Sequence, residues 1–233
     1  MRESGNYLIA FLDLLSSSRR IKDGDTKQNI IDLAYMLSVS VKQENRHGIK
    51  AFTFSDNVAI CLKIEDENML EVSLQNLCSY VCRYLWMYSG VPSSETNAVE
   101  GFMTPIRGAI VYGSLTIDDD INFICGVGLV TAYLLESKIA FYPRAIVEHK
   151  LDKYVQHSNL FSKDADGFHY VDFLENCLLY EDFVRSSIIK LTQELVEIEY
   201  QNARGKDNYS VQQKYEWLKN YVDRFCNKHK LLR

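Results

Sequence analysis

An α+β fold is predicted by this sequence, because strand-like and helix-like apolar patterns alternate along the chain. Residues 7–15 (YLIAFLDLL) and both arms of 49–63 (IKAFTFSDNVAICLK) are short apolar runs of the kind found in strands. Apolar residues recur at helical spacing over 26–45 and 67–88. These three observations place strands and helices in one mixed domain.

The run 7–15 is interrupted only by Asp13. An acid inside an apolar strand is costly unless it is paired or bound to a metal, so Asp13 is expected to have a partner. If the first strand lies beside the hairpin, Asp13 and Asp56 can share one or two divalent cations. Oxygen ligands of this kind suit Mg²⁺ or Mn²⁺, which then hold the phosphates of a nucleotide.

The segment 49–63 is predicted to be a β-hairpin that turns at Ser55-Asp56-Asn57. Both arms are apolar at nearly every position, which predicts a place inside a sheet with both faces covered. A carboxylate at the hairpin tip stands at the sheet edge, where a ligand or metal can meet it. Asp56 therefore has two interpretations, a ligand of such a site or an Asx-turn that only closes the hairpin.

The remaining elements follow from turn residues and periodicity. They are a polar connection at 16–25, an irregular loop at 90–105, a second hairpin at 106–116 with Gly113 in its turn, a helix at 129–140, a strand at 141–147, an edge strand at 170–173, and helices at 175–203 and 210–231. This order fits a ferredoxin-like sheet with helices on one face. Asp118-Asp119-Asp120 is interpreted as a solvated turn, because consecutive acids point in different directions.

Composition is that of a soluble globular protein, with 47% hydrophobic and 24% charged residues in 233. The net charge of −5 gives no basic footprint for nucleic acid or for a membrane surface. No run of about 20 apolar residues and no signal-peptide core is present, so a cytoplasmic protein is expected. The six cysteines form no CxxC pair and are expected to be buried free thiols.

Several segments in order resemble the landmarks of class III nucleotide cyclase domains. They are FLDLL, FTFSDNVAI, PIRGAIVYGSL, GVGLVTAYLLE and FYPRAIV, followed by DADGFHYVDFL and KYEWLKNY in the C-terminal part. The AY-x-LE and YPR segments, at 132–136 and 142–144, are most similar to the bacterial pyrimidine cyclases of Pycsar antiphage defence. The resemblance spans nearly the whole chain and implies a cyclase-like catalytic domain at 1–174 with a helical extension at 175–233, packed on the core or on a dimer partner.

The resemblance implies two Mg²⁺ or Mn²⁺ ions per site, held by Asp13, Asp56 and the backbone carbonyl of Leu14. It also implies a nucleotide-binding site, whose predicted residues are Ser16, Ser17, Phe52 and Phe123. Family members usually have a glycine near position 16, where this chain has Ser16-Ser17-Ser18. Backbone amides and serine hydroxyls there can cradle a triphosphate, although a plain strand-to-helix loop explains the same residues.

Two departures from ordinary class III cyclases concern the reaction itself. The positions of the family's ribose-binding and transition-state residues are Val130 and Leu134, which cannot contact a phosphate. Arg144 or Arg107 can supply the missing positive charge, or each can pair with structural carboxylates instead. The purine-selecting position is Phe52, which favours a smaller base or is simply part of the core.

Two functions remain open from the sequence. The first is a cyclase that converts UTP, or CTP, to its 3′,5′-cyclic monophosphate and pyrophosphate in a homodimer with sites at the subunit interface, the product activating a separate effector. The second is a degenerate cyclase homology domain that acts as a nucleotide sensor or dimerisation scaffold. Retention of Asp13 and Asp56 favours the enzyme, and Val130 and Leu134 favour the scaffold.

Overall fold

The structure, a computed structural model, describes residues 2–15, 48–54, 57–87, 105–179, 182–204 and 208–231, without the side chains of 83, 84, 86, 87, 182–184, 187 and 191. Several predicted features lie outside the described residues. These are the polar connection at 16–25 with Ser16 and Ser17, the helix at 26–45, the hairpin tip with Asp56, and almost all of the loop at 90–105.

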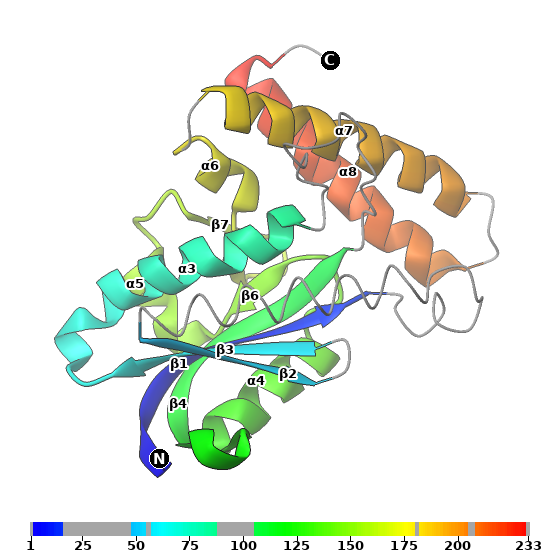
Figure 1. Ribbon diagram of the computed structural model, residues 1–233. Coiled ribbons are helices and arrows are strands. Elements are labelled where there is room, and N and C mark those ends of the chain that lie inside the picture. Colours follow the sequence, from blue (N-terminus) through cyan, green and yellow to red (C-terminus); the bar gives the residue numbers. More distant parts are fainter. Residues whose placement is uncertain are drawn as a thin grey trace.

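The described strands form one mixed sheet of eight strands (Figure 1). The strands are β1 (Arg2–Leu14), β2 (Ile49–Phe54), β3 (Asn57–Ile64), β4 (Ile106–Asp118), β5 (Phe123–Cys125), β6 (Ala145–Val147), β7 (Phe161–Lys163) and β8 (His169–Val171). Their order is β2-β3-β1-β4-β6-β8-β7, and β5 pairs with the end of β4. The β4–β6 pair is parallel and the other pairs are antiparallel.

The described helices are α3 (Leu70–Met87), α4 (Val127–Lys138), α5 (Asp152–Val155), α6 (Phe173–Cys177), α7 (Asp182–Arg204) and α8 (Tyr209–His229), with 3₁₀ turns η2 (Glu67–Met69), η3 (Asp119–Ile121) and η4 (His149–Leu151). Two of the helices begin at side-chain caps. The side chain of Asp172 accepts a hydrogen bond from the Glu175 backbone N–H at α6, and that of Asn208 accepts one from Val211 at α8. None of the helices within these described ranges is long and apolar enough to cross a membrane.

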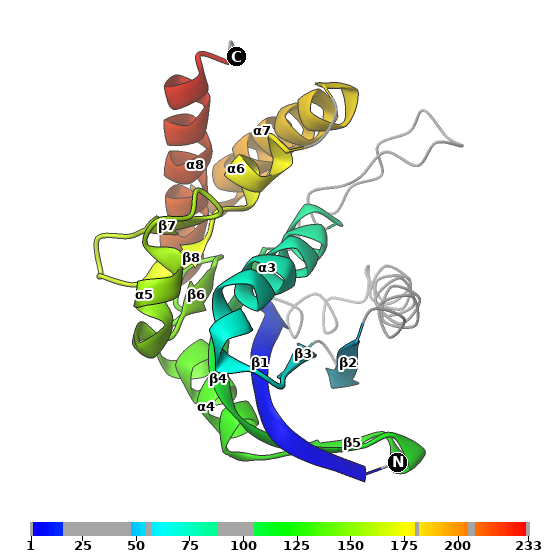
Figure 2. The ribbon, with the colours of Figure 1, turned by 90° about the vertical axis from the view of Figure 1, so that its left-hand side faces the viewer.

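Helices cover both faces of the sheet, so the prediction of helices on one face is wrong. Alternate residues of β1 point to opposite faces. Leu8 and Ala10 belong to the core beneath α3, whereas Ile9 and Phe11 belong to a second cluster with residues of α4. Figure 2 shows α3 and α4 on opposite sides of β1 and β4. This burial on both sides explains why 7–12 is apolar at every position.

Residues 106–118 form one continuous strand, so the predicted hairpin at 106–116 is wrong. β4 pairs with β1 over its whole length, from Leu14↔Ile106 to Arg2↔Asp118. Gly113 lies within the strand rather than in a turn, and a Cβ there would lie 2.8 Å from Gly128 Cα in α4. The glycine therefore lets the helix backbone approach the strand closely.

Four smaller predictions also change. The hairpin β2–β3 is present, but β2 is an outer strand of the described sheet rather than an inner one. The predicted edge strand at 170–173 is β8, which lies between β6 and β7, because residues 161–163 add a further strand outside it. The predicted helix at 175–203 is two helices, α6 and α7, and the strand at 141–147 is shortened to β6.

The C-terminal helices α7 and α8 lie side by side and are attached to the domain through α6 (Figure 1). The Tyr221 hydroxyl of α8 donates a hydrogen bond to Asp172 Oδ1 at 2.6 Å, and it accepts one from the Leu174 N–H at 2.9 Å. Burial and the neighbouring Asp172 raise the pKa of Tyr221 well above its ordinary value, so the phenol stays a donor. The predicted domain boundary after residue 174 falls within α6.

Candidate functional site

Asp13 lies one residue before the end of β1, on the sheet face covered by α4. It follows Ile9 and Phe11 at alternate positions, which places its side chain on their face. Its register partners are Asn57, the first residue of β3, and Arg107 of β4. The chain position of Asp56 directly precedes that of Asn57.

Arg107 joins two carboxylates from different elements. Its Nε donates a hydrogen bond to Asp13 Oδ2 at 3.0 Å, and the same nitrogen lies 2.6 Å from Oε1 of Glu136. Glu136 comes from α4 and is only 2% exposed, whereas the other two side chains are half-buried. The predicted partner of Asp13 is therefore a neighbouring arginine in the described structure. A buried carboxylate at this depth needs such a cation.

A second cation lies close to this group. Lys214, near the start of α8, has its Nζ 5.2 Å from the centre of the Phe141 ring. Burial lowers the pKa of Lys214, the charge of Arg107 lowers it further, and the charges of Asp13 and Glu136 oppose the change. We call Asp13, Arg107, Glu136 and Lys214 the charged cluster. Sequence reasoning did not assign a role to Glu136 or Lys214, although both lie in motifs that carried the resemblance.

Arg144 lies in a buried environment and not in an open cleft. It is 1% exposed and forms ion pairs with Asp164 and Asp166. Its guanidinium also lies between 5.5 and 5.7 Å from the ring centres of Tyr142, Tyr170 and Trp217. Of the two alternatives left by the sequence, this geometry favours pairing with structural carboxylates over contact with a substrate.

The remaining predicted site residues are spread over the sheet. Leu14 ends β1 with a buried side chain, and Phe52 of β2 is buried in the same cluster as Phe11 and Ala59. Phe123 lies on β5, which pairs with the end of β4 opposite to Arg107. Within one chain, about 11 strand residues of β4, roughly 36 Å, therefore separate the end beside Phe123 from the end beside Asp13.

The outward side of α4 is apolar and exposed. Val130 is 56% and Leu134 40% exposed, and Val127 is exposed as well. These residues have i, i+3 and i+7 spacing, so they share one face of the helix. Asp118 is the half-buried N-cap of η3, Asp119 and Asp120 are its exposed first residues, and Asp119 accepts a hydrogen bond from Lys50 at 2.8 Å. They therefore form a solvated turn, as predicted.

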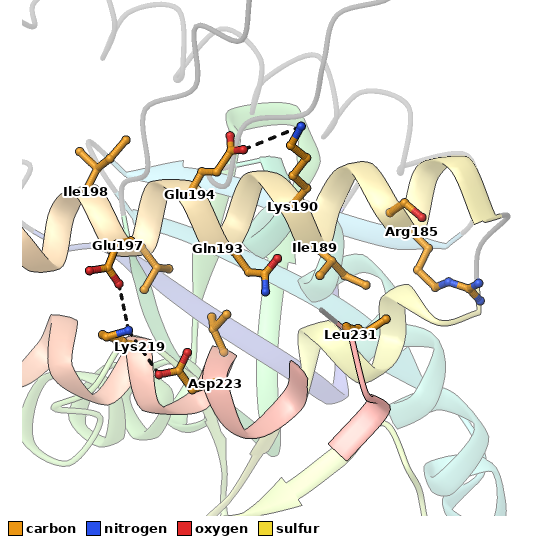
Figure 3. A pocket seen from close by; sticks show the side chains of 13 residues that line it. Arg185, Ile189, Lys190, Gln193, Glu194, Glu197, Ile198, Lys219, Asp223 and Leu231 are labelled. Carbon is orange, nitrogen blue, oxygen red and sulfur yellow. Dashed lines mark hydrogen bonds and ion pairs between the residues drawn. The ribbon is translucent and has the colours of Figure 1, made fainter. Parts of the chain in front are cut away.

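A cavity of about 1050 Å³ lies between α7 and α8 (Figure 3). Its lining comes from these two helices and Leu231, and it includes charged side chains that are paired with each other. Lys219 lies 2.9 Å from Glu197 and 3.3 Å from Asp223. The cavity holds no residue of the charged cluster, so we treat it as a gap between packed helices.

All six cysteines are free. Five are buried and Cys125 is exposed, so the expectation of buried thiols is correct for all but Cys125. Burial raises the pKa of Cys177 to about 12, which keeps that thiol protonated and unreactive.

Comparison with solved structures finds this fold in nucleotide cyclase domains. The guanylyl cyclase domain of the RhoGC fusion protein from the aquatic fungus Blastocladiella emersonii has a TM-score of 0.53 at 12% identity, over 73% of this chain and 96% of that chain. The catalytic core of a rhodopsin-guanylyl cyclase with converted specificity, solved with ATPαS, has a TM-score of 0.51 at 12% identity, over 73% and 98%. A bacterial light-regulated adenylyl cyclase has a TM-score of 0.50 at 12% identity, over 95% of this chain and 59% of that chain.

No protein-family model and no curated protein matches the sequence. The fold is thus the α+β fold of class III nucleotide cyclase domains, as the sequence predicted. These solved structures are guanylyl and adenylyl cyclase domains.

Proposed function

We propose that this protein is a cytoplasmic nucleotide cyclase whose active site is built around Asp13. The observation that carries this proposal is a half-buried carboxylate at the end of β1, in a cyclase fold, beside the hairpin that bears Asp56. Burying a charge among apolar strands costs roughly several kcal/mol unless it is compensated, and Arg107 compensates Asp13 here. The proposal therefore depends on the position of this acid in a cyclase fold and not on an unpaired charge.

The residues present fit a divalent cation by their chemistry. Asp13, Asp56 and the carbonyl of Leu14 are hard oxygen donors, which Mg²⁺ and Mn²⁺ prefer. Within the described ranges, which omit Asp56, there is no group of three or more acidic, histidine or cysteine side chains that could hold a metal. The chemistry supplied by two bound ions is activation of the ribose 3′ hydroxyl and neutralisation of the triphosphate.

In the proposed reaction the ribose 3′ oxygen attacks the α-phosphorus and the bond to the β-phosphate breaks. The products are a 3′,5′-cyclic monophosphate and pyrophosphate, and the hydroxyl proton leaves with water. Arg107 lies beside Asp13 and is our choice for the cation that stabilises the charge on the phosphorane. Glu136 fixes the orientation of Arg107 through the 2.6 Å contact. Arg144 is the second candidate for this cation, although its buried ion pair with Asp164 favours a structural role.

We further propose a pyrimidine substrate, UTP in preference to CTP. Two observations support it: the similarity of the AY-x-LE and YPR segments to pyrimidine cyclases, and Phe52 at the purine-selecting position. Phe52 is buried in the apolar cluster that also contains Phe11 and Ala59, on the same face of the sheet as Asp13. Its ring offers no hydrogen bond to the edge of a purine. Ser16 and Ser17 are proposed to bind the phosphates. The product then acts as an antiphage second messenger on a separate effector.

The active form is proposed to be a homodimer with sites at the subunit interface. Val127, Val130 and Leu134 form an exposed apolar face on α4, and such a face is costly to leave in water. A partner subunit that covers this face could also bring its Phe123 to the site, which one chain cannot do.

A second candidate function is a degenerate cyclase domain that senses nucleotides or holds a dimer together. Val130 and Leu134 favour it, since neither can bind ribose or phosphate. The deciding experiment incubates the purified protein with each of the four ribonucleoside triphosphates and Mn²⁺, with product analysis by mass spectrometry. Cyclic UMP as the main product supports the proposal. Absence of any cyclic nucleotide, with a known cyclase active in parallel, supports the degenerate domain.

A further inference from the structure

Lys214 is a half-buried cation beside the candidate site, on a helix that belongs to the C-terminal extension. Its Nζ lies over the Phe141 ring, five residues beyond Glu136 in the chain. The segment that carries Phe141 is joined to the start of β4 by a hydrogen bond of 3.0 Å from the N–H of Gly108, which follows Arg107, to the carbonyl of Arg144, so Lys214 lies beside the end of β4 that carries Arg107. The start of α8 also lies near the end of β1 in Figure 1.

No carboxylate of the described residues pairs with Lys214. In the described part of the chain it makes no ion pair and no hydrogen bond, only the contact with Phe141. Lys219, one and a half turns further along α8, is by contrast paired with Glu197 and Asp223. Arg107 hydrogen-bonds to Asp13 and lies in an ion pair with Glu136. Within the charged cluster, Lys214 is therefore the cation that no described carboxylate contacts, and it can bind phosphate in addition to the role proposed for Arg107.

The position of Lys214 is fixed by the rest of α8. Trp217, three residues later and so on the same side of the helix, stacks on Tyr142 with ring centres 5.8 Å apart. Its Nε1 donates a hydrogen bond to Asp164 Oδ2 at 2.8 Å, the carboxylate that also pairs with Arg144. Arg144 thus acts as a positioning residue, because it holds the acid that anchors Trp217 and with it the start of α8.

We propose that Lys214 is a substrate-binding residue of the candidate site, and that its ammonium group binds the β- and γ-phosphate oxygens of the nucleotide. This inference rests on the proposed function and adds a phosphate contact supplied by the C-terminal extension. Lysine is suited to this role as a compact point charge with three donors. The Phe141 ring beneath it keeps the ammonium partly out of water, which strengthens the contact with an anion.

The test compares Lys214→Met, which keeps a long apolar side chain, with Lys190→Met on α7, whose side chain is 76% exposed. The probe is inorganic tripolyphosphate with Mn²⁺, and the readout is its dissociation constant by calorimetry. We expect Lys214→Met to weaken binding about 10- to 100-fold, the usual effect of one charged hydrogen bond. Lys190→Met should bind as the wild type does, and Lys214→Arg should recover much of the loss.

Equal tripolyphosphate affinity in the wild type and Lys214→Met overturns the inference, as does a wild type that does not bind the probe. A loss that Lys214→Arg does not rescue, together with a lowered melting temperature, also overturns it, because the residue is then structural. A different result would refute the proposed function and leave this inference intact: the wild type binds tripolyphosphate through Lys214 but forms no cyclic product from any nucleoside triphosphate.

Discussion

Asp13 on β1 and Arg107 on β4 face each other across the antiparallel ladder and share a hydrogen bond of 3.0 Å. The same arginine reaches Glu136 of α4, so one guanidinium ties the centre of the sheet to the helix above it. The contact has two consequences. It places a cation against a carboxylate proposed to bind metal, and it makes the docking of α4 depend on a charge.

Arg107→Ala is expected to destabilise the protein by about 3 kcal/mol, since it removes a cation that contacts two carboxylates. Glu136 is the more deeply buried of the two. The double variant Arg107→Ala/Glu136→Gln should therefore recover part of the stability, measured by urea unfolding. If the double variant is no more stable than Arg107→Ala, then the stranded acid is not the cause.

Arg144→Ala is expected to destabilise the protein by about 3–5 kcal/mol and to loosen α8. The Arg144 side chain is only 1% exposed, and its removal takes away the buried cation that pairs with Asp164. Arg204→Ala is the matched control, since Arg204 is exposed near the end of α7 and lies over the Tyr200 ring. Thermal unfolding and Trp217 fluorescence provide the measurement. An Arg144→Ala protein with the wild-type melting temperature but greatly reduced turnover would instead support contact with the substrate.

Gly113→Ala is expected to cost about 1–3 kcal/mol by pushing α4 away from β4. The added Cβ would lie 2.8 Å from the Gly128 backbone, which cannot rotate aside. Gly5→Ala is the control in β1, because its nearest neighbour is the flexible end of Lys63 at 3.1 Å. Chemical denaturation of both variants checks this, and equal effects at the two glycines would contradict the close approach.

Glu175 makes the attachment of α8 sensitive to acid. Burial alone would raise its pKa, but the contacts with His229 at 2.8 Å and Lys228 at 2.6 Å outweigh burial and lower the pKa below 4.5. A lowered carboxyl pKa stabilises the folded state above the ordinary value of 4.5, and this stabilisation is lost as pH falls through the lowered pKa. Wild type should thus melt higher than Glu175→Gln at neutral pH.

The difference between wild type and Glu175→Gln should shrink as pH drops below 4.5. The control is Glu194→Gln on the exposed side of α7, which should follow the wild-type curve. A gap between wild type and Glu175→Gln that stays constant with pH would show that packing, not ionisation, explains the effect.

The elements with strong periodicity could be predicted from the sequence. The apolar runs around Ile9 and Ile60 and the helical spacing of Leu70, Leu74 and Leu77 each report burial of local residues. The failures arose where a distant partner defines the role. Gly113 was interpreted as a turn residue because its partner Gly128 follows 15 positions later, on another element.

The candidate site divides in the same way. Asp13 could be found because an acid in an apolar strand is conspicuous in the sequence itself. Lys214 could not be found in this way, because it lies some 200 residues after Asp13 in the chain. Its position depends on the packing of Trp217 against Tyr142, which no local pattern indicates. The acids around Arg144 likewise come from a loop 20 and 22 residues away, and no local pattern links them.

The most direct test of the central claim measures cyclic nucleotide and pyrophosphate formed by the wild type, Asp13→Asn and Asp56→Ala from the preferred triphosphate with Mn²⁺. Wild type is expected to form the two products in equal amounts. Each variant should lose at least about 100-fold in rate, because a carboxylate of the proposed metal site is gone, while keeping a cooperative melting transition. Near wild-type turnover by Asp13→Asn in folded protein would contradict the account, since the cyclase centre then lies elsewhere.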